Sequence, residues 1–196
     1  SSLHADISIM DVLMEAGAII SQQEDESSEE GSCGSGRGLI TVQRAPLRAF
    51  RTDLNNCPDL FPATALLAAW CNGTSAIAGF RRLSGKESDR GRAILDMLSR
   101  MGVEARAEDD LLTVTGQTLE SRLLGQRLLK GGEYTTSHDH RMAMALTVAS
   151  FGADGPVILD DKACVAKSFP DFFERWYEAT GLAADERMQG QIESKE

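Results

Sequence analysis

Two patterns of helix, glycine and strand alternate along the chain, and this alternation constrains the fold most. The first pattern is an apolar helix, a glycine and a strand, and it occurs at residues 59–79 and 139–160. The second is an amphipathic helix, a glycine and a hairpin, at residues 6–43 and 88–115, and again without a visible hairpin at 168–182. Strand signals that alternate with helix signals predict a mixed α/β domain built from repeats. Because the series starts with the second pattern, we expect the chain to begin halfway through a repeat.

Hydrophobic spacing and glycine stops locate the individual elements. Helices are expected at residues 6–16, 59–72, 88–101, 139–151 and 168–180, and strands at 19–20, 39–42, 75–78, 103–107, 111–114 and 156–159. The last helix is expected to open at Ser168, because Asp171 follows three residues later in a capping-box pattern. The turn between the strands of the central hairpin is expected at Asp109 and Asp110.

Two segments carry almost no large apolar side chains. Residues 21–37 are acidic and rich in Ser and Gly, and they predict a solvated loop. Residues 184–196 form a polar tail that is expected to fray. The remaining sequence, within residues 1–183, predicts one domain that is incomplete at its N-terminus.

Composition limits the classes of partner. The net charge is −10, so the surface repels nucleic acid and anionic membranes, and neither is expected as a partner. No apolar run approaches the roughly 18 residues that cross a bilayer. The four cysteines have no metal-binding or redox spacing, which indicates thiols in a reducing cytoplasm. The sequence predicts no metal site and no cofactor.

Basic side chains stand at the starts of three expected helices in this acidic chain. Lys86 and Arg90 lie at the entry to the second amphipathic helix, Arg141 lies in the first turn of the second apolar helix, and Lys167 precedes Ser168. A helix start carries partial positive charge, so each exposed cation there costs about 0.3–1 kcal/mol. Several cations at several helix starts therefore indicate a bound phosphate or carboxylate.

A local explanation for these charges stays open. Arg90 could pair with Asp89 or Glu87, and Arg141 could pair with Asp139. Asp59, Glu87 and Asp139 could each be a simple helix cap. Pattern alone does not separate these pairs from a shared anion site.

The segments PDLFP, KESDR, DHRMAMA and KSFPDFF occur in this order, and the chain opens with ADISIMDVLMEAGA. Together they closely resemble the C-terminal motifs of the EPSP synthases, the 3-phosphoshikimate 1-carboxyvinyltransferases. The resemblance extends over residues 3–180. The related UDP-N-acetylglucosamine enolpyruvyl transferases share the fold, but they are not expected to carry KESDR or this form of the DHR segment.

The resemblance implies a fold and a reaction. Each domain of the family contains three βαβαββ units around a pseudo-threefold axis, and this chain corresponds to most of the C-terminal half. The implied reaction transfers the enolpyruvyl group of phosphoenolpyruvate to the 5-hydroxyl of shikimate 3-phosphate, in aromatic amino acid biosynthesis. The N-terminal domain of the same polypeptide, which carries the other phosphate ligands, is not in the chain. We therefore expect a monomer that folds as this fragment but has little or no turnover alone.

Two residues match the family's catalytic carboxylates. Asp59 matches the aspartate that contacts hydroxyl groups of shikimate 3-phosphate and accepts a proton. Glu87 matches the glutamate that exchanges a proton with the methylene carbon of phosphoenolpyruvate.

Five basic residues match substrate-binding positions. Arg90 and Arg141 match the arginines that hold the carboxylate of phosphoenolpyruvate, and Lys167 matches the lysine on its phosphate side. Lys86 matches a lysine near both substrates. Arg82 falls where some members have Asn in contact with shikimate 3-phosphate, so its match is weaker.

Two alternatives remain at this point. One is an enolpyruvyl transferase that acts on another acceptor, such as UDP-N-acetylglucosamine. The other is a domain of the same fold that has lost catalysis. The charges retained at the helix starts argue against a domain without catalysis, because a disused site has no physical reason to keep them.

Overall fold

One complete βαβαββ unit forms the centre of the molecule. The computed structural model describes residues 5–24, 38–43, 45–83, 89–116, 121, 124 and 129–181. In the central unit the elements follow in the order β3 (Arg51–Asp53), α2 (Phe61–Trp70), β4 (Thr74–Ala78), α3 (Arg90–Arg100), β5 (Glu104–Glu108) and β6 (Leu111–Thr115). Its four strands form one sheet in the order β3-β4-β6-β5, in which β3 and β4 are parallel and the other neighbours antiparallel.

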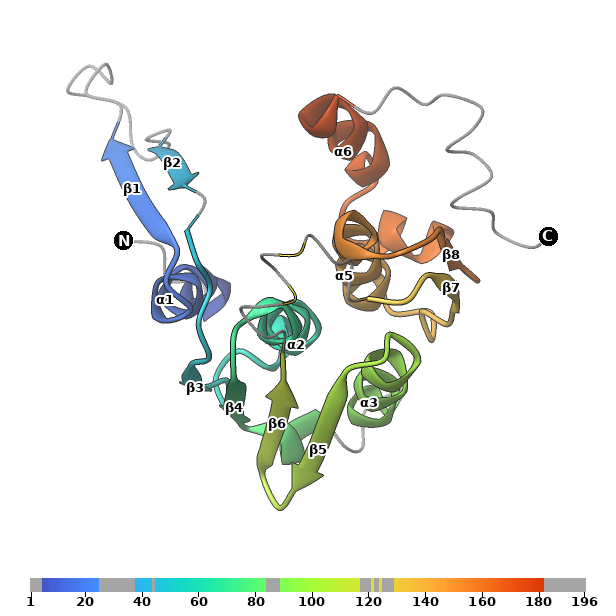
Figure 1. The fold of residues 1–196 in the computed structure, drawn as a ribbon. Helices are drawn as coiled ribbons and strands as arrows, with labels where there is room; N and C mark the ends of the chain where they lie inside the picture. The colour runs from blue at the N-terminus through green and yellow to red at the C-terminus, as the bar shows by residue number, and fades with distance from the viewer. Residues whose placement is uncertain are drawn as a thin grey trace.

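Two partial units lie on either side of the central one (Figure 1). Before it come α1 (Ile9–Glu15), β1 (Ile19–Glu24) and β2 (Gly38–Gln43), and the two strands form an antiparallel hairpin. After it come β7 (Gly132–Tyr134), α5 (His140–Ala149), β8 (Val157–Leu159) and α6 (Phe172–Thr180), with β7 and β8 parallel. The described parts therefore read αββ, βαβαββ and βαβα, which confirms the repeated mixed fold predicted from the sequence.

Short 3₁₀ helices join these elements. They are η1 (Ala5–Ser8), η2 (Pro58–Leu60), η3 (Phe80–Leu83), η4 (Ser150–Gly152) and η5 (Ala163–Lys167). Proline at the start of η2 suits a helical first turn, since its fixed φ is already helical and it lacks an N–H that would stay unpaired. η2 runs directly into α2, so Asp59 lies in the first turn of one continuous helical segment.

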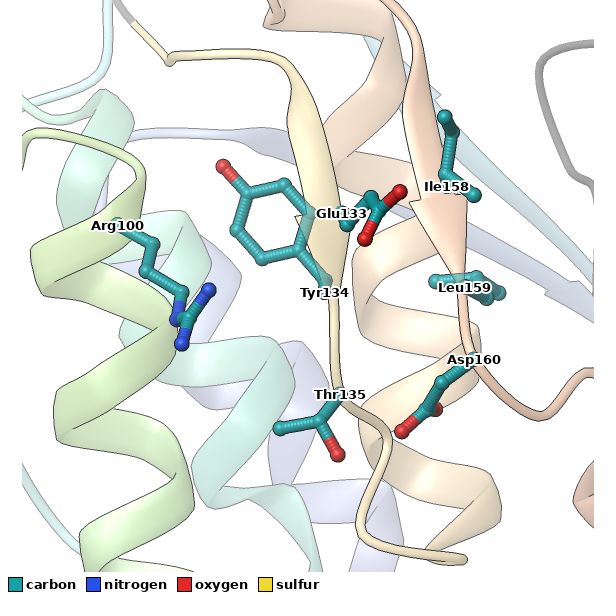
Figure 2. Close-up of a pocket in the computed structure, with 7 residues that line it drawn as sticks. All are labelled: Arg100, Glu133, Tyr134, Thr135, Ile158, Leu159 and Asp160. Carbon is teal, nitrogen blue, oxygen red and sulfur yellow. The ribbon is translucent and has the colours of Figure 1, made fainter. Parts of the chain in front are cut away.

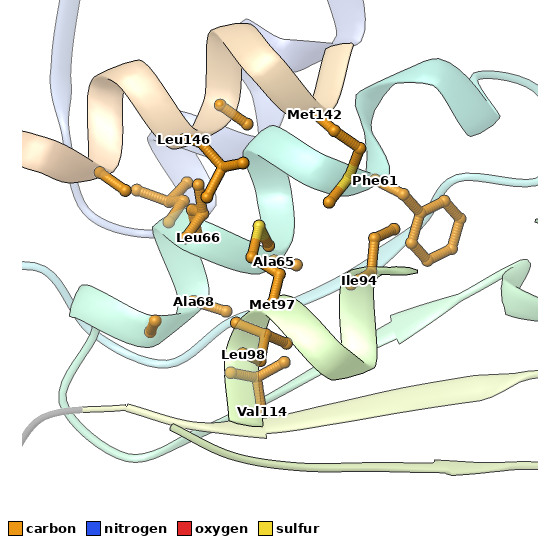
Figure 3. Close-up of a cluster of buried hydrophobic side chains, with 14 of the residues drawn as sticks. Phe61, Ala65, Leu66, Ala68, Ile94, Met97, Leu98, Val114, Met142 and Leu146 are labelled. Carbon is orange, nitrogen blue, oxygen red and sulfur yellow. The ribbon is translucent and has the colours of Figure 1, made fainter. Parts of the chain in front are cut away.

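The first helices of the second and third units form the core. Eight of the ten residues of α2 are buried, which explains why its sequence is apolar on every face. α5 packs against α2, and α3 covers α2 with Ile94, Met97 and Leu98 (Figure 3). These contacts fix the starts of three helices relative to one another.

Two sequence predictions need correction. Residues 21–24 are not part of a loop, because they continue β1 and pair with residues 38–41 of β2. Backbone pairing across this exposed hairpin does not require apolar side chains, so the polar composition of residues 21–24 does not indicate a strand. Residues 25–37 and 182–196 lie outside the described ranges.

The last helix does not open at Ser168. α6 begins at Phe172 with Asp171 at its N-cap, and Ser168 is instead the C-cap of η5. Pro170 explains the difference, since the residue before a proline is pushed out of the helical region. The capping-box pattern at Ser168 therefore has no helix to cap.

No helix within the described ranges is long and apolar enough to cross a membrane.

Gly116 marks a close approach that only glycine allows. It follows β6 and lies against the end of α2, where an added Cβ would overlap the carbonyl oxygens of Cys71 and Ala68. We expect Gly116→Ala to lower the free energy of unfolding by about 1–3 kcal/mol in urea denaturation, because helix backbone must move. Gly155→Ala is the control, since its Cβ would meet only Gly131 Cα at 3.9 Å. An equal effect of both substitutions would contradict this account.

Candidate functional site

Four charged side chains from three helix starts form a ring of ion pairs, which we call the Arg–Asp ring. Arg90 Nε donates to Asp139 Oδ2 at 2.7 Å, and Arg90 Nη1 donates to Asp59 Oδ1 at 2.9 Å. Arg141 Nη2 donates to Asp59 Oδ2 at 2.7 Å, and Arg141 Nη1 lies 3.6 Å from Asp139 Oδ1. The structure thus brings together three residues singled out from the sequence, Asp59, Arg90 and Arg141, and adds Asp139.

Local helix chemistry places each member of the ring. Asp139 is the N-cap of α5, and its Oδ1 accepts from the backbone N–H of Arg141 at 2.9 Å. Arg90 is the first residue of α3, whose N-cap is Asp89. Asp89 accepts from the backbone N–H of Arg92, so it is a cap and not the partner of Arg90. The predicted local pair of Arg141 with Asp139 is present, but both arginines also bind Asp59, which belongs to the same unit as Arg90 and to a different unit from Arg141.

Burial separates the two aspartates. The Asp139 side chain is 7% exposed and Arg90 is 11% exposed, whereas Asp59 and Arg141 are 36% and 29% exposed. Two arginines and two aspartates cancel in formal charge, which removes the penalty of cations at helix starts. Asp139 and Arg90 therefore form the structural side of the ring, and Asp59 and Arg141 form its accessible side.

The charges of the ring change the proton affinity of Asp59. Partial burial alone would raise the pKa of this carboxyl group, but the nearby Arg141 and Arg90 guanidiniums outweigh burial and hold the pKa below its usual value. Asp59 is therefore ionised at neutral pH. As long as both arginines hold it, it is a weak proton acceptor.

An apolar groove of about 700 Å³ opens beside the ring. Side chains of α1, α2 and α5 line most of it, among them Ile9, Leu13, Leu66, Trp70, Met144 and Val148. Asp59, His140, Arg141, Ser168 and Phe169 supply the remaining walls. The low polarity of such walls strengthens electrostatic interactions at the polar end.

His140 has no assigned role in the sequence analysis, but it lines this groove. Burial and the neighbouring Arg141 guanidinium lower the pKa of the imidazole. His140 is therefore neutral at physiological pH and can donate or accept a hydrogen bond beside Asp59. Nothing in the sequence distinguishes it from a structural histidine, since its effect depends on the arginine next to it.

Lys167 does not stand at a helix start, in contrast to the prediction. It is the last residue of η5, where a cation suits the negative end of the helix. η5 packs on α5, the helix that Asp139 caps. Burial and the Asp161 carboxylate raise the pKa of the Cys164 thiol. Asp139 also raises this pKa and Lys167 lowers it, so both charges lie near the thiol.

Among the predicted site residues that remain, the structure describes only Arg82. Arg82 Nη1 donates to the carbonyl oxygen of Asn55 at 2.9 Å, so Arg82 contacts the loop that leads to η2. Lys86 and Glu87 lie outside the described residues. Within the described ranges, no group of three or more His, Cys, Asp or Glu side chains could hold a metal ion.

A second, smaller cavity of about 230 Å³ lies between α3 and the β7–β8 strands (Figure 2). Its one cation among the lining residues is Arg100, which already binds Asp96 at 2.8 Å. Glu133 and Asp160 also line it, and Asp160 accepts from Thr136. This cavity therefore offers an anion less than the Arg–Asp ring does.

Solved structures place the fold among the enolpyruvyl transferases. The structure of an EPSP synthase from Acinetobacter baumannii matches with a TM-score of 0.70 and 25% identity, over 88% of this chain and 38% of that chain. An enolpyruvyl transferase from Streptomyces tendae matches over 88% of this chain and 34% of that chain, with a TM-score of 0.57. At 18% identity the Streptomyces protein shows a likeness of fold alone.

Sequence comparison identifies the family. The profile of EPSP synthase (3-phosphoshikimate 1-carboxyvinyltransferase) matches residues 1–176. A 3-phosphoshikimate 1-carboxyvinyltransferase from Thermococcus kodakarensis is 37% identical over 172 residues, which are 88% of this chain and 37% of the relative. One from Clostridium novyi is 33% identical over 189 residues, which are 96% of this chain and 38% of the relative. The chain belongs to the EPSP synthase family, as its motifs predict, and it spans little more than a third of the length of these relatives.

Removal of one arginine should test which side of the ring is structural. Arg90→Ala leaves the buried Asp139 without its 2.7 Å partner, so we expect a loss of about 3 kcal/mol in the free energy of unfolding. Arg141→Ala should cost about 1 kcal/mol, because Arg141 is 29% exposed and water can solvate Asp59. Urea denaturation of both variants provides the comparison. A larger loss for Arg141→Ala would contradict the assignment.

The lowered pKa of Asp59 predicts a pH dependence of stability with a definite sign. A carboxyl group with a lower pKa in the folded state stabilises the fold above its unfolded pKa, and this contribution is lost as the pH falls through the folded value. We expect the urea midpoint of the unmodified chain to exceed that of Asp59→Asn at pH 6, and the difference to narrow below about pH 4. A difference that is constant from pH 6 to pH 3 would mean that ionised Asp59 is not its source.

Proposed function

We propose that the complete protein transfers the enolpyruvyl group of phosphoenolpyruvate to the 5-hydroxyl of shikimate 3-phosphate, giving EPSP and phosphate. Family membership supports this reaction, which belongs to the shikimate pathway of aromatic amino acid biosynthesis. The single observation that carries it for these residues is that Arg90 and Arg141 together hold a carboxylate, that of Asp59. A pair of arginines already arranged around one carboxylate suits the carboxylate of phosphoenolpyruvate.

The proposed chemistry needs a base at the 5-hydroxyl of shikimate 3-phosphate and an acid at C3 of phosphoenolpyruvate. The shikimate 5-hydroxyl adds to C2 of phosphoenolpyruvate and loses its proton, while C3 gains a proton. Phosphate then leaves as C3 loses a proton, which restores the double bond. We assign the proton acceptor at the hydroxyl to Asp59 and the proton exchange at C3 to Glu87.

Basic side chains hold the substrates in this proposal. Arg90 and Arg141 bind the carboxylate of phosphoenolpyruvate, and Lys167 lies on its phosphate side. Lys86 lies near both substrates, and Arg82 contacts shikimate 3-phosphate. Fixed cations position the two anions and stabilise the charge that develops during addition.

The chain supplies part of this site. It spans 37% of the Thermococcus relative, and we propose that the rest of the polypeptide provides further phosphate ligands and closes over the substrates. We further propose that the complete protein is a cytoplasmic monomer that needs no cofactor. The 196-residue chain by itself is expected to show little or no turnover.

Turnover by the complete protein tests the function. With phosphoenolpyruvate and shikimate 3-phosphate we expect release of phosphate and formation of EPSP, detected by a phosphate assay and mass spectrometry. UDP-N-acetylglucosamine is the matched alternative acceptor and should give no product. Glu87→Gln should slow turnover by about a hundredfold or more, because it removes an acid–base group but keeps the shape. The proposal fails if UDP-N-acetylglucosamine alone is accepted, or if Glu87→Gln keeps full activity.

A further inference from the structure

We propose that Asp59 is an internal competitor of the ligand: its carboxylate occupies the two guanidiniums that the ligand carboxylate takes, and ligand binding releases Asp59 from them. This inference rests on the proposed function, because it assigns the ligand carboxylate to Arg90 and Arg141. It adds an order of events, in which the proton acceptor becomes available only after the arginines have a new partner.

The contacts of Asp59 are those expected for a ligand carboxylate. One oxygen accepts from Arg90 Nη1 at 2.9 Å, and the other accepts from Arg141 Nη2 at 2.7 Å. A carboxylate of phosphoenolpyruvate has the same shape and charge. Two carboxylates cannot use the same two N–H groups at full strength, so one must leave.

Burial decides which aspartate leaves. The Asp59 side chain is 36% exposed, so water can solvate it after release. The Asp139 side chain is 7% exposed, and it also caps α5 through the backbone N–H of Arg141. Displacement of Asp139 would bury an unpaired charge and uncap a helix, which together cost far more than release of Asp59.

Release changes the chemistry of Asp59. In the unliganded chain the two guanidiniums hold the pKa of this carboxyl group low. A ligand carboxylate that neutralises them removes this effect, and the pKa rises toward the range of a useful proton acceptor. The ring therefore couples occupation of the arginines to activation of the base.

Two isosteric variants within the ring provide the test. The complete protein and its Asp59→Asn, Asp139→Asn and Asp96→Asn variants are titrated with phosphoenolpyruvate by calorimetry or by NMR. Asp59→Asn should bind about tenfold more tightly, because a charged competitor is gone. Asp139→Asn removes the same charge but frees only Arg90 Nε, which is not one of the two donors that Asp59 occupies. It should therefore bind phosphoenolpyruvate no more tightly than the unmodified protein does. Asp96→Asn is the control for net charge, since Asp96 pairs with Arg100 farther along α3, and it should leave binding unchanged.

Each result decides between the readings. Equal or weaker binding by Asp59→Asn overturns the inference, because Asp59 then supports the arginines and does not compete. Equal tightening by Asp59→Asn and Asp139→Asn also overturns it, because net charge alone would explain the gain. No binding by any variant refutes the assignment of the carboxylate to these arginines, and thereby the proposed site itself. Asp59→Ser, measured in parallel, keeps the test valid if Asp59→Asn does not fold, as judged by circular dichroism.

Discussion

The Arg–Asp ring is the interaction on which the rest of the site depends. Its members come from η2, α3 and α5, so the ring fixes three helix starts that are far apart in the sequence. Cations at helix starts are unfavourable, and two arginines so close together would also repel each other. Asp59 and Asp139 remove both penalties, which allows the two arginines to stay side by side without a ligand.

The internal repeat explains the presence of two aspartates. Asp59 stands between β3 and the apolar helix α2, and Asp139 stands between β7 and the apolar helix α5. They occupy corresponding places in successive units and reach the same pair of arginines from two sides. Their burial nevertheless differs, at 36% and 7% of the side chain exposed. The repeat therefore accounts for two similar carboxylates. Packing buries Asp139 within the fold and leaves Asp59 accessible to solvent.

The sequence reveals the helix starts and their charges but not the pairing between units. Glycine stops and hydrophobic spacing locate α2, α3 and α5, because these signals are local. The three-residue strands β3 and β7 are too short for an alternation to be visible. The link from Arg90 to Asp139 joins residues 49 positions apart, and no local rule predicts it. The start of α6 was missed because the effect of Pro170 overrides an apparent cap at Ser168.

In the proposed site, stability and ligand binding compete at Asp59. The carboxylate stabilises the unliganded fold through the same N–H groups that a ligand carboxylate needs, so part of the binding free energy must replace an existing interaction. A chain without Asp59 would offer a ligand two arginines with no competing carboxylate, but it would also place uncompensated cations at two helix starts. Partial exposure of Asp59 is a compromise between these demands, since a fully buried aspartate could not be displaced and a fully solvated one would stabilise little. The half-buried position of Asp59 is therefore the property on which the proposed competition depends.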